Sequence, residues 1–430
     1  MDSTPSNQDP FFGNIALKRP EEILVEDRKT VSLHLLVKNG ASCVERLIDN
    51  VGPYIREVVA VINDTTDETF EILQKKCDYY DLLFNTIEIT AKSHPSLYLL
   101  DVPETYMVGS SLHGEIYEGP FTGRPLLADW AGARNLGWVH TFSEWRLFLD
   151  ADDEVVDPES IPGLCLALEE RGVDLAATRY CFRQTKDGHV HSDGFRERLA
   201  SHTPAIRWEG VAHEILRGAS RTAHVDGSLQ VVDRRDSSGS DLRPAGRCFK
   251  VLYREARLKN WQVSPRNLIY MAMECQKETP ALAEAVIDLY LTKSTWKEER
   301  AWAYVMRGEI CAERKDFGGA SKWFEHSLAE HPGAKAAFRL CYSRFQEGKW
   351  REAIDAYRQG IKNKAILQVL ESGEVFEHMS KILVAAAYRK LGDHDNALKF
   401  CDEALVAFPE NTTLHTLKTE LLKAAKRRSP

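Results

Sequence analysis

The C-terminal part of the chain carries an internal repeat, and this repeat restricts the possible fold more than any other feature of the sequence. Alanine marks the repeat at three places, and a side chain suited to a helix–helix contact follows each alanine after four residues. Glycine precedes two of the alanines by five residues, and proline follows two of them by twelve. The positions are Ala320, Ala353 and Ala397; Phe324, Tyr357 and Cys401; Gly348 and Gly392; and Pro332 and Pro409.

This spacing is typical of helical hairpins. Small side chains at fixed points let two paired helices approach closely, and proline ends the second helix. The three alanines are 33 and 44 residues apart, which matches the tetratricopeptide period of about 34 residues with an insertion near residues 363–374. A degenerate earlier hairpin is expected over residues 265–294. The sequence therefore predicts an all-α, tetratricopeptide-like helical repeat domain over residues 247–430.

The N-terminal part shows a different pattern, in which short apolar strands alternate with helices. β-Rich runs at Val31–Val37 and Glu57–Ile62 have the length of buried strands, and apolar residues at helical spacing follow each run. We also expect a strand over residues 97–102 and a central strand at Trp145–Leu149. This alternation predicts an α/β domain with parallel strands over residues 29–246, in which ligands bind at the carboxyl ends of the strands.

The length predicts two or three domains, and the net charge argues against a general nucleic-acid coat. A chain of 430 residues is too long to form one ordinary hydrophobic core. Its formal net charge is -8, whereas a protein that coats nucleic acid needs a broad basic face to neutralise phosphates. Residues 1–28 are expected to be a polar lead-in without a secretory signal. The sequence contains no apolar run long enough to predict a membrane span. The nine cysteines are scattered without a CxxC pair, which is typical of reduced thiols and a cytoplasmic location.

Acidic residues follow the central strand directly, at Asp150, Asp152 and Asp153. Carboxylates at positions i and i+2 after a buried strand can reach one hard divalent cation, which prefers oxygen ligands. A bound diphosphate would supply further oxygens, and the ion would neutralise charge that develops on this leaving group. The alternative is an acidic helix-capping turn, which Asp157 before a proline would also suit.

Five segments of the chain follow one another with a known order and spacing, namely residues 31–39, 58–69, 131–135, 146–153 and 209–214. Together they resemble the family 2 glycosyltransferases of the GT-A fold. The resemblance covers residues 30–220 and is nearest to the branch that carries C-terminal tetratricopeptide repeats, which includes bacterial peptide S-glycosyltransferases. It implies a Rossmann-like nucleotide-sugar-binding domain and a hexosyl or pentosyl transferase. It also implies Mn²⁺ or Mg²⁺ and a nucleotide-sugar donor, with a UDP-sugar as the default.

The resemblance places roles on individual residues. Asp150 would approach the donor ribose or sugar and share the divalent ion with Asp152. His213 would be a late metal- or diphosphate-binding ligand, and Arg134 would lie near the nucleotide. The edge of the first strand would border the base through Val37, Lys38 and Asn39.

Two of these residues also have simpler interpretations. Arg134 could form a structural ion pair with the acidic turn, and His213 could be a hydrogen-bonded core residue. For a single histidine without the surrounding motifs, the core interpretation would be the more common one.

Two positions depart from the family pattern. The second strand ends in Asn63 and Asp64, where the family usually has one or two aspartates. The carboxylate that meets the uracil or ribose is therefore either absent or displaced to Asp64. Gly40 stands where a glutamate usually follows the Lys-Asn pair. These departures leave the nucleobase open.

The resemblance implies an inverting displacement, in which a carboxylate deprotonates the acceptor as it attacks the anomeric carbon. The candidates for this base are Glu214, Glu209 and Asp153, in that order. The acceptor is expected to be a peptide or protein side chain, because repeat arrays present extended concave surfaces to chain-like partners. Alternatively, the repeats could form a homodimer or support the catalytic domain.

Two other functions stay open at this stage. The chain could be a catalytically inactive scaffold that binds partners through its repeats. It could also glycosylate a modified nucleic-acid base, in which case the basic stretch at residues 234–259 would dock on the nucleic acid. The simpler interpretation of that stretch is a solvated helix face, because acidic residues interrupt it.

Overall fold

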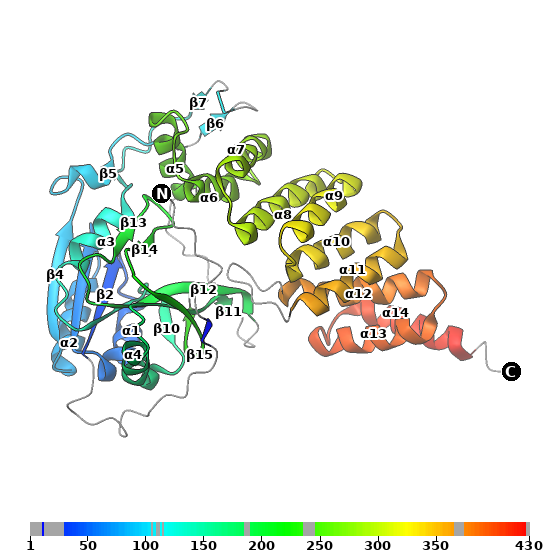
Figure 1. Cartoon of the computed structure of the whole chain (residues 1–430), viewed down its shortest axis with the longest axis horizontal. Coiled ribbons are helices and arrows are strands. Elements are labelled where there is room, and N and C mark those ends of the chain that lie inside the picture. The colour runs from blue at the N-terminus through cyan, green and yellow to red at the C-terminus, as the bar shows by residue number, and fades with distance from the viewer. Residues whose placement is uncertain are drawn as a thin grey trace. The chain divides into compact units, whose positions relative to one another are not determined.

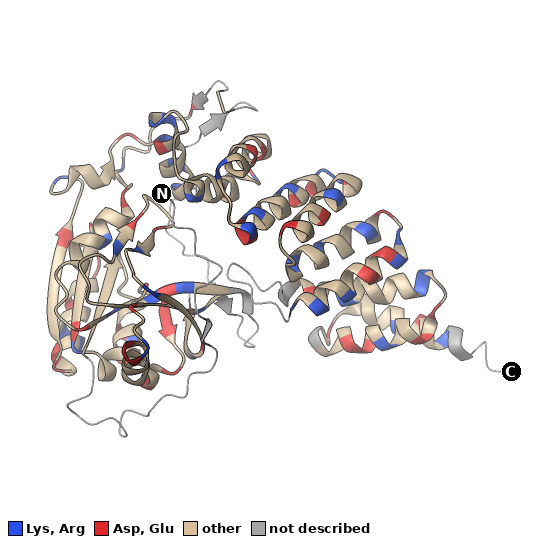
Figure 2. Cartoon of the chain, viewed as in Figure 1, with Lys and Arg blue, Asp and Glu red and all other residues tan. Residues whose placement is uncertain are grey.

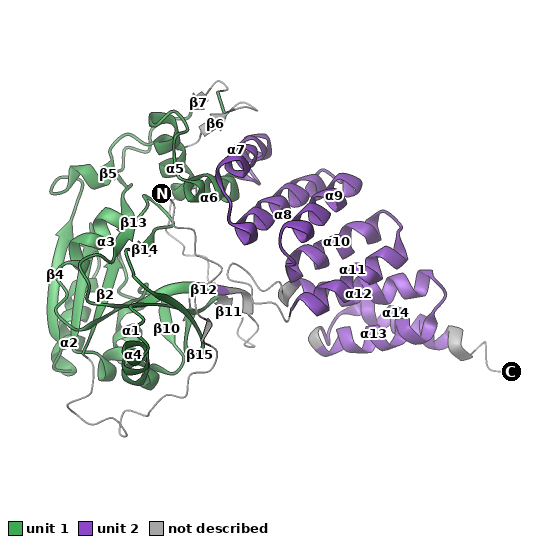
Figure 3. Cartoon of the chain, in the orientation of Figure 1, with its two compact units in different colours: residues 1–189, 195–275 green, residues 190–194, 276–430 purple. Residues whose placement is uncertain are grey.

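The protein consists of two compact units (Figures 1 and 3). Unit 1 comprises residues 1–189 and 195–275, and unit 2 comprises residues 190–194 and 276–430. Apart from strand β1 (Phe11–Phe12), the expected lead-in falls outside the described residues, as does most of the expected repeat insertion. The computed structural model describes residues 11–12, 30–104, 106–108, 112–113, 116–184, 190–234, 246–364 and 374–426.

Unit 1 is a mixed α/β domain built on one large sheet. Four neighbouring strands run parallel in the order β4, β3, β2 and β9. The next strand, β12, runs antiparallel to β9, and the sheet continues through β11 and β15. The strands are β2 (Val31–Val37), β3 (Glu57–Asn63), β4 (Leu83–Ile89), β9 (Trp145–Phe148), β10 (Asp153–Val155), β11 (Leu175–Gln184), β12 (Val190–Ser201) and β15 (Thr222–Asp233).

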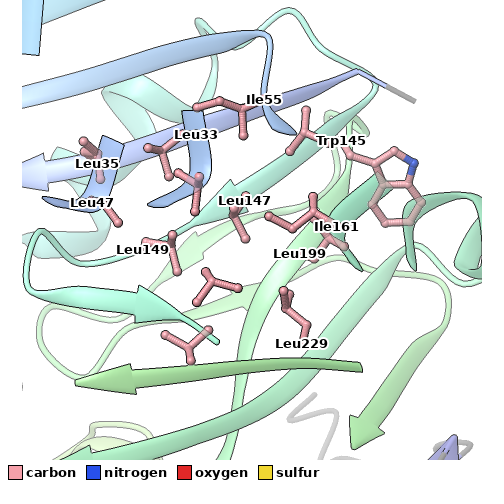
Figure 4. Close-up of a cluster of buried hydrophobic side chains, with 14 of the residues drawn as sticks. Leu33, Leu35, Leu47, Ile55, Trp145, Leu147, Leu149, Ile161, Leu199 and Leu229 are labelled. Carbon is pink, nitrogen blue, oxygen red and sulfur yellow. The ribbon is translucent and has the colours of Figure 1, made fainter. Parts of the chain in front are cut away.

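Helices cover both faces of the parallel strands, and alternate residues of β2 show this arrangement. Leu33 and Leu35 pack in one buried cluster with Leu47 of α1 and with residues of α2 and α4 (Figure 4). His34 points to the other face and contacts Trp138 of α3. Strands β2, β3 and β9 are therefore buried on both faces, as the continuous apolar runs predicted. The helices are α1 (Val44–Val51), α2 (Thr69–Tyr79), α3 (Trp130–Trp138) and α4 (Ile161–Glu170).

The third parallel strand differs from the expectation. Residues 97–102 hold only the short strand β5 (Tyr98–Leu99), which pairs with β8 (Leu126–Leu127) outside the main sheet. The parallel sheet instead takes β4 as its edge strand. Strand β4 reads Leu-Phe-Asn-Thr-Ile-Glu-Ile and is largely half-exposed or exposed. Because an edge strand is not buried on both faces, β4 lacks the continuous apolar run that marks β2 and β3.

Unit 2 is a helical repeat, which confirms the predicted tetratricopeptide-like architecture. Ala320, Ala353 and Ala397 are all fully buried, as their repeated spacing requires. Among the described residues, no helix combines the length and apolar character needed to span a membrane. The helices are α7 (Pro280–Lys293), α8 (Lys297–Glu313), α9 (Phe317–Glu330), α10 (Ala334–Gln346), α11 (Trp350–Asn363), α12 (Glu374–Lys390), α13 (His394–Ala407) and α14 (Thr412–Lys426).

The boundary between the units lies later than the change of sequence pattern. Helical sequence begins at Arg247 as predicted, but helices α5 (Arg247–Leu258) and α6 (Pro265–Cys275) belong to unit 1. One reason is that Arg266 of α6 donates from Nε to the carbonyl oxygen of His213, at 2.9 Å. The hairpin expected over residues 265–294 corresponds to α6 and α7, of which only α7 belongs to unit 2.

Candidate functional site

Polar loops meet at the carboxyl ends of the parallel strands. The Lys38 ammonium lies 3.1 Å from the Asp64 carboxylate, and the Thr66 N–H donates to Asn39 Oδ1 at 2.8 Å. Asn39 and Asp64 both adopt the left-handed conformation, with φ values of 48° and 45°, which asparagine and aspartate tolerate better than most residues. Three of the predicted base-side residues are therefore brought together. Of the other two, Val37 is buried and Asn63 accepts a hydrogen bond from Tyr98 Oη at 2.6 Å.

Asp150 stands at the carboxyl end of β9 between two arginines. Its Oδ1 lies 3.3 Å from Nη2 of Arg134, which α3 supplies, and its Oδ2 lies 4.0 Å from Nη2 of Arg198, which β12 supplies. The Asp150 side chain is 37% exposed, whereas both arginines are buried. Asp150 is thus an accessible carboxylate on a positively charged support.

Arg134 connects the acidic turn to the turn that carries Glu214. Besides binding Asp150, its Nε donates to the Glu214 carboxylate. Its guanidinium lies 4.1 Å from the ring centre of Phe148 and 5.2 Å from that of Trp208, which are cation–π contacts. Its Nη1 is buried without a hydrogen-bond partner in the described part of the chain. The ion pair with the acidic turn is therefore present, and one strong donor beside it is unused.

Asp153 differs from its neighbours in being completely buried. Its carboxylate accepts hydrogen bonds from the Asp150 N–H at 2.8 Å and from Tyr180 Oη at 2.7 Å. Burial raises the pKa of Asp153, and Arg198, at 3.6 Å, acts in the opposite direction. These contacts stabilise the turn from inside. A carboxylate so enclosed does not reach an acceptor, which argues against Asp153 as the base that deprotonates the acceptor.

Asp152 lies on the side of the turn that faces the start of α1. Its carbonyl oxygen accepts hydrogen bonds from Arg46 Nη2 at 3.2 Å and from the Arg234 N–H at 2.9 Å. Burial raises the pKa of the Cys43 thiol, and the negative charge of Asp152 adds to this effect. Asp152 is half-buried as a whole residue.

Glu209 and Glu214, the two other candidates for the base that deprotonates the acceptor, have different surroundings. Glu209 ends β13 (Arg207–Glu209), and its side chain is 52% exposed at 3.7 Å from Arg207. Glu214 precedes β14 (Ile215–Arg217), and its side chain is only 7% exposed and held by Arg134. Of the two, Glu214 is the one that shares a partner with Asp150.

His213 binds α6. Its ring stacks on Tyr270 with ring centres 4.3 Å apart, and its Nε2 lies 2.9 Å from Glu274 Oε1. The Cys248 thiol of α5 belongs to the same cluster, in which the ligand atoms of His213, Cys248 and Glu274 all lie within 4.8 Å of one another. Sequence reasoning missed Cys248 and Glu274, because both helices had been assigned to the repeat domain and neither residue stands in a ligand-like spacing.

Some described residues of the basic stretch at 234–259 are paired or buried within the chain. Arg234 pairs with Glu154 at 3.0 Å, and Lys259 pairs with Glu255 at 2.6 Å. Lys250 is buried, and burial lowers its pKa. The residues of the basic stretch between 235 and 245 lie outside the described residues.

The helices of unit 2 carry charges of both signs. Acidic and basic residues alternate along them (Figure 2), and many pair between neighbouring helices, as Arg339 does with Glu309 at 2.7 Å.

Comparisons with known proteins give likenesses at low scores. No model of a known protein family matches this chain, and no curated protein matches it. Among solved structures, the Arabidopsis OM64 TPR domain is 13% identical, with 30% of this chain and 98% of that chain covered and a TM-score of 0.26. MamA is 18% identical (42% and 99% covered, TM-score 0.32), and the type IV pilus biogenesis factor PilW is 18% identical (40% and 74% covered, TM-score 0.33).

These scores are too low to support a conclusion about function. The tetratricopeptide-like character of unit 2 rests on its own helices and on the buried alanines that repeat along them.

Proposed function

We propose that the protein is a metal-dependent, inverting glycosyltransferase, and that unit 1 is its GT-A-type nucleotide-sugar-binding domain. The main support is the meeting of three loops at the carboxyl ends of β3, β2 and β9, which are adjacent and parallel. In open α/β sheets this edge is where ligands bind. The loops carry the polar residues that the resemblance assigns to the donor.

The donor base is assigned to the loops after β2 and β3. Lys38, Asn39 and Asp64 lie together there and offer hydrogen-bond donors and acceptors at half-exposed or exposed positions. Asp64 is the carboxylate at this edge, in place of the aspartate that usually ends the second strand. A UDP-sugar remains the default donor.

The donor-side divalent ion, Mn²⁺ or Mg²⁺, is assigned to Asp150 and Asp152. Both carry carboxylate oxygens just after β9 and are partly exposed as residues, and oxygen ligands suit a hard cation. Such an ion supplies neutralisation of the charge that develops on the leaving diphosphate. His213 is omitted from this ligand set, because its ring is held by Tyr270 and Glu274.

The chain's own residues would do the rest of the chemistry. Arg134 and Arg198 support the Asp150 carboxylate and bring positive charge to the diphosphate. Glu214 is the first candidate for the base that removes the acceptor proton, because Arg134 holds it at the same site as Asp150. Glu209 is the second candidate, since it is exposed. Asp153 is no longer a candidate because it is fully buried.

The acceptor is assigned to the repeat unit. Tetratricopeptide-like arrays present extended surfaces that suit a peptide or protein chain. The paired charges along these helices, such as Arg339 with Glu309, favour a partner of mixed charge over a nucleic acid. A protein side chain is therefore the proposed acceptor.

The test is a panel of nucleotide sugars with Mn²⁺, scored by thermal shift and by donor hydrolysis. Asp152→Asn keeps the size of the side chain but removes the charge. We expect it to abolish the Mn²⁺-dependent thermal shift and to lower turnover by at least about 100-fold, the usual cost of a lost electrostatic group at a reacting centre.

Asp157→Asn is the matched control, because Asp157 is exposed and lies outside the carboxyl edge. It should behave like the unmodified protein. Full activity of Asp152→Asn would refute the metal assignment. If no donor is hydrolysed or stabilises the protein, the inactive-scaffold alternative is favoured instead.

A further inference from the structure

Three potential metal ligands of different chemistry meet in unit 1. His213 lies in the turn between β13 and β14, Cys248 lies in the first turn of α5, and Glu274 lies near the end of α6. Their ligand atoms lie within 4.8 Å of one another, and all three residues are partly exposed. Among the described residues, no other group of three or more His, Cys, Asp or Glu side chains is clustered in this way.

The surrounding contacts hold His213 in position. Its backbone is left-handed with a φ of 52°, a conformation that is unfavourable for a non-glycine residue and persists only where the surroundings impose it. Arg266 binds its carbonyl oxygen at 2.9 Å, and Tyr270 stacks on its ring at 4.3 Å. The imidazole is thereby aimed at Glu274 before any ligand is present.

The chemistry of the three donors indicates the kind of ion. Imidazole nitrogen, thiolate sulfur and carboxylate oxygen together favour zinc and similar transition metals, whereas Mg²⁺ and Mn²⁺ prefer oxygen ligands alone. We propose that His213, Cys248 and Glu274 bind one zinc-like divalent ion, with water in the fourth position. This site is separate from the donor-side ion at Asp150 and Asp152, and it does not depend on the proposed transferase activity.

The His213–Glu274 pair requires little adjustment, and the Cys248 sulfur, which lies within 4.8 Å of both partners, would approach them by up to about 1.2 Å. Metal–ligand bonds of about 2.0–2.3 Å place the donors of a tetrahedral zinc ion about 3.3–3.7 Å apart. His213 Nε2 and Glu274 Oε1 are 2.9 Å apart, so they would separate by roughly 0.4 Å to admit the ion. Cys248 would bind as the thiolate, and its proton would leave to solvent.

The ion would have a structural consequence for the transferase site. It would fasten the turn between β13 and β14 to α5 and α6, and this turn also carries Glu214. Because Glu214 binds Arg134 and Arg134 binds Asp150, the ion would help to fix the position of Glu214. His213, Cys248 and Glu274 are therefore positioning residues.

The experiment measures zinc bound by the full-length chain after chelator treatment and reconstitution. We expect one zinc per chain for the unmodified protein and at least about 100-fold weaker zinc binding for Cys248→Ala, because loss of a direct ligand exceeds the loss caused by outer contacts. Cys311→Ala is the matched control. Cys311 is also a half-buried free cysteine, but it lies in unit 2, so the variant should bind zinc normally.

Cobalt substitution adds a spectroscopic test. The cobalt-loaded protein should show thiolate-to-cobalt charge-transfer absorption, and Cys248→Ala should lack it. Equal zinc binding by the unmodified protein and by folded Cys248→Ala would overturn the proposal. If Cys248→Ala does not fold, absence of the charge-transfer band from the unmodified protein overturns it instead.

Asp152→Asn separates this site from the donor-side ion. It should retain zinc while losing the Mn²⁺-dependent response to the donor. Loss of zinc from Asp152→Asn would mean that the two assigned sites are one, which also overturns the proposal.

Discussion

His34 is a histidine that the fold keeps neutral. It lies fully buried on β2, and both ring nitrogens are without a hydrogen-bond partner in the described part of the chain. Its neighbours are the rings of Trp138 and Phe148, with centres at 5.5 and 6.1 Å. Burial lowers the pKa of His34 to about 3, and the positive charge of Arg134 acts in the same direction.

This depressed pKa predicts a loss of stability in acid. The unfolded chain binds a proton at His34 below about pH 6.5, whereas the folded chain does not until about pH 3. The stability due to the neutral ring is therefore complete above the unfolded pKa and is lost as the pH falls. Between pH 7 and pH 5 the loss amounts to about 2 kcal/mol.

Denaturation of unmodified protein and of His34→Leu at both pH values measures this effect. On going from pH 7 to pH 5, the unmodified protein should lose about 2 kcal/mol more free energy of unfolding than His34→Leu does. His140→Leu serves as the control, because His140 is exposed and should show no such change. A difference that stays constant with pH would contradict the assigned burial.

At the scale of the element, the turns inside the repeat hairpins share one backbone conformation. Gly348 and Gly392 have φ values of 77° and 79°, and Lys315, at the equivalent position of the preceding hairpin, has a φ of 61°. A left-handed residue other than glycine costs about 1–2 kcal/mol. The hairpin of α8 and α9 therefore carries backbone strain that the next two hairpins avoid.

Replacing Lys315 by glycine should relieve this strain. Glycine also costs entropy in the unfolded chain, about 0.4–1 kcal/mol, so we expect a net gain of about 0.5–1 kcal/mol in the unfolding free energy of unit 2. Urea denaturation measures the change. Gly348→Ala is the reverse experiment and should cost about 1 kcal/mol; a stabilising effect of that substitution would contradict the shared turn conformation.

The sequence predicted the helices and strands whose packing produces a regular pattern of nearby residues. The buried strand Val31–Val37 and the buried helix contact at Ala320 could be predicted. Burial along a strand or at a repeated helix position leaves a regular spacing of apolar or small residues in the sequence. Strand β4 was missed because an edge strand needs no continuous apolar run. The membership of α5 in unit 1 was missed because it depends on contacts far apart in the sequence.

The positions of the candidate site residues were predictable to a similar degree, although their roles stay predictions. Asp150, Lys38 and Asn39 follow strand ends, and the parallel order of the strands brings strand ends together. The buried role of Asp153 depends on Tyr180 and Arg198 from other strands. Local spacing carries no information on such partners.

At the scale of the whole molecule, each unit has a hydrophobic core of its own. The core of unit 1 includes Leu33 and Leu147, and that of unit 2 includes Phe324 and Tyr357. Chains with more than one core commonly unfold in more than one transition. A substitution in one core should therefore shift the transition of that unit.

Phe324→Ala provides this test. The Phe324 ring is buried to 1% exposure, and truncation of a buried phenylalanine costs about 3–5 kcal/mol. We expect the transition of unit 2 to move to lower denaturant concentration. Leu147→Ala should move the transition of unit 1 instead, and a single transition shifted equally by both variants would contradict independent cores.

The close approach of rings to glycines in unit 2 differs from one hairpin to the next. In α8 and α9, a Cβ on Gly308 would lie 2.4 Å from the Phe324 ring, whereas in α10 and α11 the ring is Phe338 on the first helix and the glycine is Gly360 on the second. The hairpins are consequently not interchangeable modules. Grafting α9 in place of α11 would set Ser327 beneath the Phe338 ring, where even a methyl group has no room, so that shuffled or idealised versions of this array must exchange both helices of a hairpin together.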